Sequence, residues 1–398
     1  MNLKRSFIVF FLSFSLAGAS LQTYAQPVKP PGIVVRHIPA TTKTYIGSPS
    51  ICILPNGDYV ATHDHFGPAT TEHERALTAV YKSTDKGRSW KKISEINGQF
   101  WSNLFVHKKG LYIFGTWKHH GNLIIRRSTD GGTTWSEPDG STTGLLREGE
   151  YHTAPMPMVI HNGRLWRAIE NAKSESAKWG LRYSAMVISA PTGADLLNAA
   201  SWTTTNFLPY NPAYLDGKFG GWIEGNAVVT PEGKLVDILR VATSEKGREL
   251  AAIVNISEDG LTAAFDPTTG FMDFVGGARK FSIRYDEKSN RYWTICNMIT
   301  KEFSNMDAGS VRNTLVIKSS SDLKNWTVHK VLLHHPDVKN YGFQYIDWQF
   351  DRKDIIFLSR TAWDDESGGA HNFHDANYLT FHRISNFMKL QKDHIENQ

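Results

Sequence analysis

Side chains that can move protons or bind anions occur in several short groups along this sequence. The first group contains His63, Asp64 and His65, and the second contains His119 and His120. Histidine exchanges protons near neutral pH. Arginine, which recurs later in the chain, can hold a carboxylate through two parallel hydrogen bonds. The combination indicates acid–base chemistry on an anionic substrate.

Arginine and tryptophan residues supply candidate binding groups. Arg167, Arg240 and Arg360 occupy similar positions in segments that we expect to be the second strands of repeated units. Three converging guanidinium groups would indicate an anionic substrate, and structural salt bridges are the alternative. Trp101 and Trp222 suit stacking on sugar faces, although each could equally pack between sheets.

We therefore predict a polar binding site to which several units contribute. The predicted catalytic residues are His63, His120 and Tyr151. The predicted substrate-binding residues are Trp101, Asn103, Lys118, His152, Arg167, Trp222, Glu224, Arg240 and Arg360. The alternative is that these polar groups only satisfy backbone groups around a wet central channel.

Three other chemistries find less support in the sequence. His63 and His65 alternate along an expected strand and could chelate a metal, but spacing fixes no third ligand. We therefore predict no metal and no cofactor, and leave a structural calcium ion open. The Gly-x-Ser-x-Gly motif of a serine nucleophile does not occur. For the carboxylate pair of ordinary glycoside hydrolysis, Glu170 and Glu224 are the best-placed acids and Asp64 is the next.

One turn motif recurs along the chain and shows that the protein is built from repeats. Ser83–Trp90 contains an Asp-x-Gly-x-x-Trp turn that returns 45 residues later as Ser128–Trp135. A degenerate copy starts at Ser257, and a copy one residue shorter occupies Ser320–Trp326. The aspartate can accept hydrogen bonds from its own turn, and the glycine allows a positive φ. We expect the tryptophan to pack between neighbouring sheets.

Strand and turn patterns around each motif predict an all-β fold. In the second unit the expected strands are Ser102–His107, Leu111–Thr116, Leu123–Ser128 and Thr134–Ser136. We expect a β-propeller of six or seven four-stranded blades, closed by an N-terminal strand at Ile33–His37. The first strands line the central channel, so polar side chains at their starting ends should converge. These strands are expected to start near Ser48, Trp101, Tyr151, Gly221, Arg279 and Tyr341.

The first 25 residues have the pattern of a signal peptide. Lys4 and Arg5 precede the apolar run Phe7–Ala17, and Ala25 precedes the expected cleavage point. Residues 26–398 would then form a single propeller domain of a secreted or periplasmic protein. Loss of this segment lowers the formal net charge from +5 to +3, which argues against nucleic acid as a partner. No later stretch is apolar enough to predict a membrane span.

The composition is that of a folded protein, with 12% aromatic and 21% charged residues. Cys52 and Cys296 are the only cysteines in the sequence. We expect them to be two buried thiols, with a single disulfide as the alternative.

The repeated turns resemble the Asp boxes of sialidase-like propellers. The Arg-Ile-Pro motif of sialidases is absent near the start of the sequence, and no Tyr/Glu nucleophile pair is evident. Other stretches resemble a different propeller group, the lyases and α-L-rhamnosidases that act on L-rhamnose-α-1,4-D-glucuronate in arabinogalactan and gum arabic. These stretches are Trp101–Phe105, Tyr151–Arg167, Gly220–Asn226 and His334–Tyr345.

This second resemblance implies removal of terminal L-rhamnose by β-elimination at the glucuronate. In the similar ulvan lyases a tyrosine is followed 16 positions later by an arginine, which is the spacing of Tyr151 and Arg167. The three arginines would bind the carboxylate, and Tyr151 would act as acid or base with His63 and His120. The alternative is hydrolysis of the same bond by an exo-α-L-rhamnosidase. A sialidase or a non-catalytic glycan-binding propeller fits less well.

The expected partner is therefore an acidic oligosaccharide or polysaccharide. We expect no nucleic acid, no membrane span and a monomeric protein.

Overall fold

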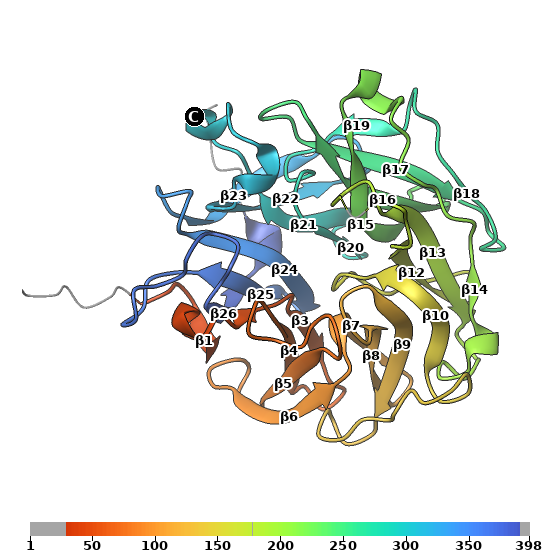
Figure 1. Cartoon of the computed structure of the whole chain (residues 1–398), viewed down its shortest axis with the longest axis horizontal. Helices are drawn as coiled ribbons and strands as arrows, with labels where there is room; N and C mark the ends of the chain where they lie inside the picture. Colours follow the sequence, from red (N-terminus) through yellow and green to blue (C-terminus); the bar gives the residue numbers. More distant parts are fainter. Residues whose placement is uncertain (1–28, 177, 391–398) are drawn as a thin grey trace, which may run out of the picture.

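A computed structural model describes residues 29–176 and 178–390 (Figure 1). The expected signal peptide lies outside the described residues. Within these ranges the strands pair in antiparallel fashion and the helices are short 3₁₀ segments, so the fold is all-β as predicted. None of the described helices is long and apolar enough to cross a membrane. The 3₁₀ segments are Ala40–Thr42, Ala199–Ser201, Tyr214–Gly217, Lys301–Phe303, Ala308–Ser310 and Phe387–Lys389.

The described strands form five sheets that lie around a common centre (Figure 1). One sheet combines the two ends of the described chain, in the order β1 (Ile33–His37), β26 (Tyr378–Ile384), β25 (Asp354–Ala362) and β24 (Gly342–Asp351). The next contains β2 (Tyr45–Ile46), β3 (Ser50–Ile53), β4 (Tyr59–Phe66), β5 (Leu77–Ser83) and β6 (Lys91–Asn97). The expected pairing of the N-terminal strand with the last strands is thus present.

The third sheet is the largest of the five, with eight strands where the others have four or five. Its strands are β7 (Phe100–His107), β8 (Gly110–Thr116), β9 (Gly121–Ser128), β10 (Leu145–His152), β11 (Val159–His161), β12 (Arg164–Asn171), β13 (Ser184–Pro191) and β14 (Thr203–Thr204). The fourth contains β15 (Phe219–Val229), β16 (Leu235–Thr243), β17 (Leu250–Ile256), β18 (Ala263–Ala264) and β19 (Phe271–Asp273). The fifth contains β20 (Ser282–Asp286), β21 (Arg291–Asn297), β22 (Thr314–Ser320) and β23 (Thr327–His334).

The observed strands follow the expected repeat except around the third unit. Thr134–Ser136 was expected to be a strand, but the fourth strand of the second unit is β10. Pro138 follows this segment closely and lacks the N–H that would continue a ladder. Tyr151 consequently lies at the end of β10, which also pairs with β12, rather than at the start of a first strand.

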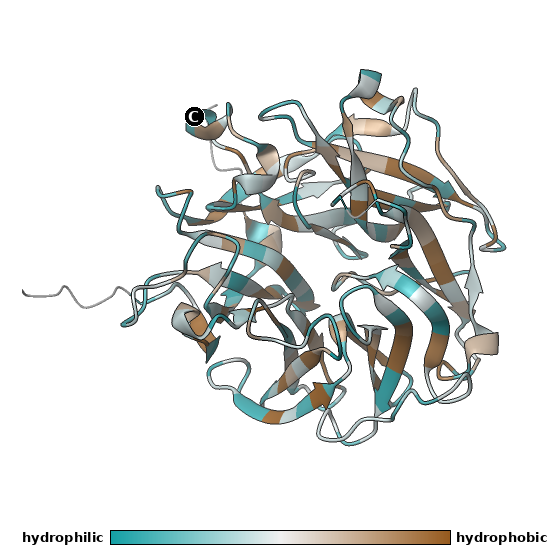
Figure 2. Ribbon diagram, viewed as in Figure 1, coloured by the Kyte–Doolittle hydropathy of each residue, from teal (hydrophilic) through white to brown (hydrophobic). Residues whose placement is uncertain are grey.

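The hydrophobic core lies between neighbouring sheets. Figure 2 shows that apolar residues concentrate on the strands, whereas the connecting loops are mostly hydrophilic. Trp90 of the first Asp box packs against Tyr59 and Phe381, which belong to different sheets, with ring centroids 6.4 and 5.4 Å away. Trp326 of the last copy packs on Phe274. The expected role of these tryptophans is confirmed.

The Asp box is stabilised by hydrogen bonds within its own turn, as the sequence predicts. The side chain of Asp85 accepts hydrogen bonds from the backbone N–H and hydroxyl of Ser89, 2.9 and 2.6 Å away. These bonds lower the pKa of Asp85 to about 2. Gly87 has φ of +87°, and a Cβ there would collide with the ring of Phe381. The motif therefore stabilises the turn and allows the close approach of the next sheet.

The two cysteines are free and buried, as expected. Burial raises the pKa of the Cys52 thiol to about 12, so the thiol stays protonated. Neither cysteine is a reactive group of the kind that would define a site.

Candidate active site

Three first strands carry a bulge at the same end of their sheets. The pairing register shifts next to Trp101 in β7, Glu224 in β15 and Tyr345 in β24. Each of these residues has a positive φ, of 42°, 60° and 53° respectively. A left-handed conformation at a non-glycine residue costs on the order of 1–3 kcal/mol and is concentrated at functional sites. The three bulges therefore mark a candidate active site.

The residue two positions after each bulge anchors it to the neighbouring sheet. Asn103, Asn226 and Asp347 occupy these positions, and all three side chains are buried. Asn226 accepts a 2.9 Å hydrogen bond from the backbone of Ile283, and Asp347 accepts one of the same length from Ile51. These bonds hold the strained residues in place through contacts between sheets.

Arginines surround Tyr345 on one side of the site. The guanidinium groups of Arg312 and Arg360 lie 5.2 and 4.8 Å from the centre of its ring. Arg240 also interacts with the Tyr345 hydroxyl and forms a 3.0 Å ion pair with Glu224. Three cations from different segments thus surround one hydroxyl and one carboxylate. We call this group the arginine side, and its members are Glu224, Arg240, Arg312, Tyr345 and Arg360.

The arginine side is held by further hydrogen bonds to its surroundings. Arg240 donates to the carbonyl of Ala278, and Arg312 donates to the side chain of Gln344. Burial alone would lower the pKa of Arg240, but the carboxylate of Glu224 and the hydroxyl of Tyr345 outweigh it and raise the pKa. Burial lowers the pKa of Arg360 to about 10. All of these arginines remain charged at neutral pH, which makes the group suitable for an anion.

Histidines and aromatic rings form the other side of the site. The ring of Trp101 lies 4.4 Å from that of His119 and 4.6 Å from that of His152. A 3.0 Å hydrogen bond joins Nε2 of His120 to the hydroxyl of Tyr183. We call this group the histidine side, and its members are Trp101, His119, His120, His152 and Tyr183.

His119 and His120 on the histidine side are uncharged at neutral pH. Burial, and then the neighbouring imidazoles, lowers the pKa of His119 to about 3 and lowers the pKa of His120 further. Burial raises the pKa of the Tyr183 hydroxyl above its usual value. The two histidine rings are therefore neutral, and Tyr183 keeps the proton that it can share with His120.

Glu170 connects the two sides. One of its oxygens pairs with Nδ1 of His152 at 2.7 Å, and the other accepts the backbone N–H of Gly225 at 3.1 Å. Gly225 directly follows Glu224, so the link ends beside the arginine side. After burial, the carboxylates of Glu170 and Glu224 contribute to the raised pKa of Tyr183. The two sides thus belong to one electrostatic environment.

The structure brings together six of the predicted site residues. These are Trp101, His120 and His152 on the histidine side, and Glu224, Arg240 and Arg360 on the arginine side. Lys118 is half-buried in the loop that carries His120.

Three predicted residues point elsewhere. His63 is fully buried against Tyr81 and His65, because alternate residues of β4 face the same way. Tyr151 packs in the hydrophobic core formed by strands of the eight-stranded sheet, where its hydroxyl accepts a hydrogen bond from Arg147. Trp222 is likewise a core residue.

Two further predicted residues, Arg167 and Asn103, form a hydrogen bond with each other. Arg167 is fully buried and donates to the side chain of Asn103 at 2.8 Å and to backbone carbonyls. Its guanidinium group is therefore engaged inside the protein. In the sheet of β2 to β6 the residue that faces the site is Asp64, whose side chain accepts a hydrogen bond from the backbone N–H of Trp101 at 2.9 Å.

Sequence reasoning missed Tyr183, Arg312 and Tyr345. The sequence signal for Tyr345 is the Asn or Asp that follows two positions later, and it recurs in three first strands. In each of these strands the Asn or Asp is buried and the residue two positions before it has a positive φ. The three segments are Trp101–Asn103, Glu224–Asn226 and Tyr345–Asp347. Arg312 precedes β22 in a loop, and no repeat marks it.

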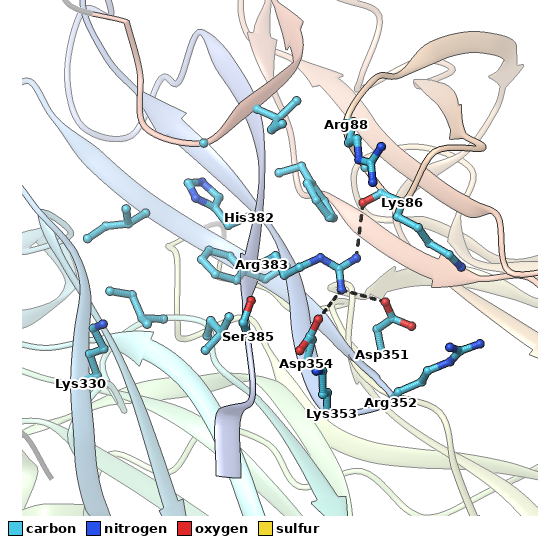
Figure 3. A pocket seen from close by; sticks show the side chains of 18 of the residues that line it. Lys86, Arg88, Lys330, Asp351, Arg352, Lys353, Asp354, His382, Arg383 and Ser385 are labelled. Carbon is cyan, nitrogen blue, oxygen red and sulfur yellow. Dashed lines mark hydrogen bonds and ion pairs between the residues drawn. The ribbon is translucent and has the colours of Figure 1, made fainter. Parts of the chain in front are cut away.

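A large cavity lies away from this site. It has a volume of about 1070 Å³ and lies at the ends of β24 and β25 that are remote from Tyr345 and Arg360 (Figure 3). Its central cation, Arg383, is paired with Asp351 and Asp354 at 2.9 Å each. Its other basic side chains, such as Lys86, are exposed on the surface. The two non-glycine residues with positive φ in its lining, Lys86 and Arg352, are exposed. The strained residues at the three bulges instead contact buried arginines and a buried histidine, so we place the chemistry at the bulges.

Comparison with known proteins identifies the fold. The sequence matches no family model and no curated protein. A Penicillium chrysogenum α-L-arabinanase complexed with arabinobiose matches with a TM-score of 0.56 at 14% identity, over 91% of this chain and 99% of that one. The fold is sialidase-like. A mutant of a Fusarium graminearum α-L-arabinofuranosidase with an iminosugar inhibitor gives 0.57 at 12% identity, over 89% and 96% of the two chains.

A third solved structure is a sialidase. The Trypanosoma rangeli sialidase in complex with sialic acid matches with a TM-score of 0.51 at 14% identity, over 89% of this chain and 56% of that one. The described strands therefore have the fold of the β-propeller glycosidases, as the Asp boxes indicated.

Proposed function

We propose that this protein cleaves a glycosidic bond of an acidic glycan and that the arginine side holds the sugar carboxylate. The observation that carries the proposal is the convergence of Arg240, Arg312 and Arg360 on Tyr345. Guanidinium groups stay charged and match the geometry of a carboxylate. The similarity in fold to glycosidases supports the same class of substrate.

For the reaction we propose β-elimination at a glucuronate that carries a terminal L-rhamnose on O4. The C5 proton is attached to the carbon next to the carboxylate, so its base must lie beside the arginines, where Tyr345 is. Tyr345, acting as its phenolate, takes up this proton and becomes a phenol, the C5–H electrons form the C4=C5 bond, and the C4–O4 bond breaks. The arginines stabilise the negative charge that develops on the carboxylate.

The leaving O4 needs a proton, and the histidine side provides a donor. Tyr183 keeps its proton because burial raises its pKa, and it is bonded to His120. His120 is less buried than Tyr183 and can pass its ring N–H proton to O4 as the rhamnose departs, while its other ring nitrogen takes up the hydroxyl proton of Tyr183. The products are free rhamnose and an unsaturated uronate.

Hydrolysis of an acidic glycan is the second candidate, and Glu224 is the observation that favours it. Glu224 and Tyr345 both contact Arg240, so a carboxylate and a tyrosine face the same substrate position. Tyrosine is the nucleophile of sialidases, and a sialidase is among the proteins similar in fold. An exo-α-L-rhamnosidase acting on the same linkage belongs to this candidate.

The experiment is incubation of the purified protein with gum arabic, followed by measurement of free rhamnose and of ultraviolet absorbance. Elimination produces both rhamnose and the absorbance of a conjugated uronate. Rhamnose with a saturated glucuronate end would establish hydrolysis instead. Binding without release of any sugar would overturn the proposal and indicate a glycan-binding propeller.

The matched variants are Tyr345→Phe and Tyr285→Phe. Tyr285 lies on β20, is 44% exposed and takes no part in the site. The first variant should lose activity and the second should keep it.

The ring that we propose has six blades. The eight-stranded sheet would divide at β10 into one group of β7 to β10 and a second group of β11 to β14. Pairing of β1 with β26 would close the ring. Secretion and a monomeric state stay predictions.

A further inference from the structure

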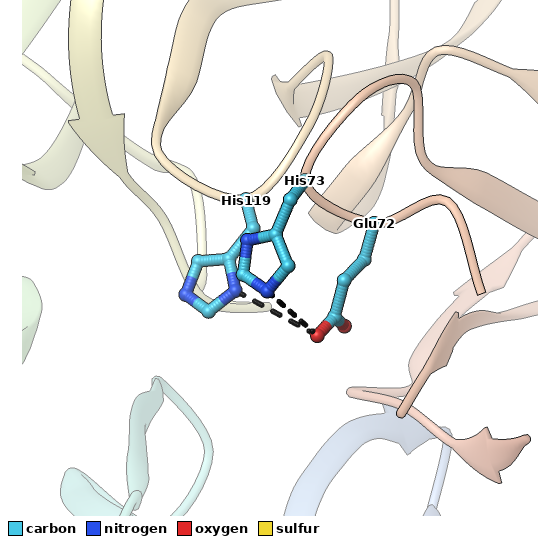
Figure 4. Close-up of side chains that lie close together, drawn as sticks. All are labelled: Glu72, His73 and His119. Atoms are coloured by element: carbon cyan, nitrogen blue, oxygen red, sulfur yellow. Dashed lines mark ion pairs between the residues drawn. The ribbon is translucent and has the colours of Figure 1, made fainter. Parts of the chain in front are cut away.

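Three potential metal ligands meet where two loops touch at the edge of the histidine side. Oε1 of Glu72 lies 3.3 Å from Nε2 of His73 and 4.0 Å from Nδ1 of His119. All three ligand atoms lie within 4.8 Å of one another. Figure 4 shows the two imidazoles facing the carboxylate from neighbouring loops. We propose that Glu72, His73 and His119 bind a divalent transition-metal ion, with zinc as the best match.

The distances suit a small tetrahedral ion. Zinc binds nitrogen and oxygen at about 2.0–2.2 Å, which places neighbouring ligand atoms of a tetrahedron about 3.4 Å apart. The Glu72–His73 distance of 3.3 Å already meets this requirement. The 4.0 Å distance between Oε1 of Glu72 and Nδ1 of His119 would need to shorten only slightly for both atoms to bind the same ion. Two imidazoles also argue against calcium or magnesium, which prefer oxygen ligands.

The ligands are held close together before any ion binds. The backbone N–H of His119 donates to the carbonyl of Glu72 at 2.7 Å, and Ala76 donates to the carbonyl of Trp117 at 3.2 Å. These bonds join the loop that carries Glu72 and His73 to the loop that carries His119. The rings of His73 and His119 stack at 4.8 Å with an angle of 19°.

The ring of His119 provides an independent reason to expect a ligand. Its Nδ1 atom is buried and has no hydrogen-bond partner within the described part of the chain. A buried polar atom that lacks a partner is unfavourable. A bound cation would satisfy this atom.

The three ligands leave one tetrahedral position open. Among the described residues no fourth His, Cys, Asp or Glu joins the group. That position is therefore available to water or to a substrate oxygen. The ion would also fix His119, whose ring lies 4.2 Å from that of His120. The proposal does not depend on which bond the enzyme cleaves.

The test is binding of Zn²⁺ and Co²⁺ to protein that carries no affinity tag and has been treated with EDTA. We expect one equivalent of Zn²⁺ by calorimetry, visible absorption typical of tetrahedral Co²⁺, and a rise in Tm on adding Zn²⁺. The variants Glu72→Gln and His73→Ala should weaken binding at least about tenfold.

The controls separate loss of the site from loss of the fold. The His73 side chain is 70% exposed, so the metal-free variant should unfold at the same temperature as the metal-free parent. His161→Ala removes a histidine of β11 and should leave binding unchanged. Substoichiometric binding, or binding that both ligand variants leave unchanged, would overturn the proposal.

Discussion

The arginine side and the histidine side of the candidate site differ in charge although both consist of buried and half-buried side chains. Glu224 pairs with Arg240 and offsets the cost of burying that cation. On the other side, burial and neighbouring imidazoles hold the pKa of His119 near 3, and so the ring is neutral. The difference suggests a division of work in which the arginine side binds the carboxylate and takes the C5 proton, and the histidine side protonates the leaving oxygen.

This division depends on what each side can exchange with its surroundings. Arginine holds a carboxylate but does not give up its proton at neutral pH. A neutral imidazole beside a protonated tyrosine, as in His120 and Tyr183, can both accept and donate. Substitutions on the arginine side and substitutions on the histidine side should therefore change different kinetic constants.

The largest expected effect comes from Tyr345→Phe. Removing the hydroxyl that the arginines surround should lower kcat about 10³-fold, because the group acts on the reacting atoms in either chemistry. Rhamnose release from gum arabic measures the effect, with Tyr285→Phe as the control. Activity close to that of the parent would mean that the arginine side is not the reacting side.

The second largest effect comes from Arg312→Lys. Lysine keeps the charge but cannot bond Gln344 and a carboxylate in the fork geometry of arginine. We expect kcat/KM to fall about 10–100-fold for an acidic glycan. The control is Arg352→Lys, an exposed residue after β24. An equal loss on a carboxyl-reduced glycan would contradict a role in binding the carboxylate.

A smaller effect is expected on the histidine side. Tyr183→Phe removes the hydrogen bond to His120 and should lower kcat about tenfold with little change in KM. Tyr210→Phe is a matched control because its hydroxyl bonds the carbonyl of Phe219 in the core. A rise in KM with unchanged kcat would assign Tyr183 to substrate binding and would contradict its role in proton transfer.

The smallest effect concerns stability and comes from Asp64, below Trp101. Burial raises the pKa of Asp64 to about 8. The folded protein therefore keeps a proton that the unfolded chain loses above about pH 4, and the free energy of unfolding falls as the pH rises from 4 to 8.

Asp64→Asn cannot ionise and should remove this dependence. The variant should gain stability relative to the parent by more than about 1 kcal/mol between pH 5 and pH 8. Denaturant unfolding at the two pH values measures the gain. A difference that does not change with pH would show that Asp64 is already ionised at pH 5.

The fold could be predicted from the sequence because its signals are local. The Ser83–Trp90 turn contains its own hydrogen-bonding partners, so its shape does not depend on distant residues. The same holds for the strands of the second unit, whose observed bounds differ from the expected ones by one or two residues, except where β10 replaces Thr134–Ser136.

The site could be predicted only in part because its geometry is not local. Side chains alternate between the two faces of a strand, so the directions of Tyr151 and Arg167 depend on where their strands lie in the fold. Tyr151 lies on β10, and its side chain points into the core. Arg312 reaches Tyr345 from a loop of another sheet. No spacing in the sequence encodes that contact.

The sequence by itself determined the repeat, the all-β character and the wealth of histidine and arginine at strand ends. Each of these follows from short-range patterns of turns and alternation. The tertiary structure decided which of those side chains meet. Bulges at Trp101, Glu224 and Tyr345 rotate single residues out of the strand pattern, and only packing between sheets can hold a residue in that strained conformation.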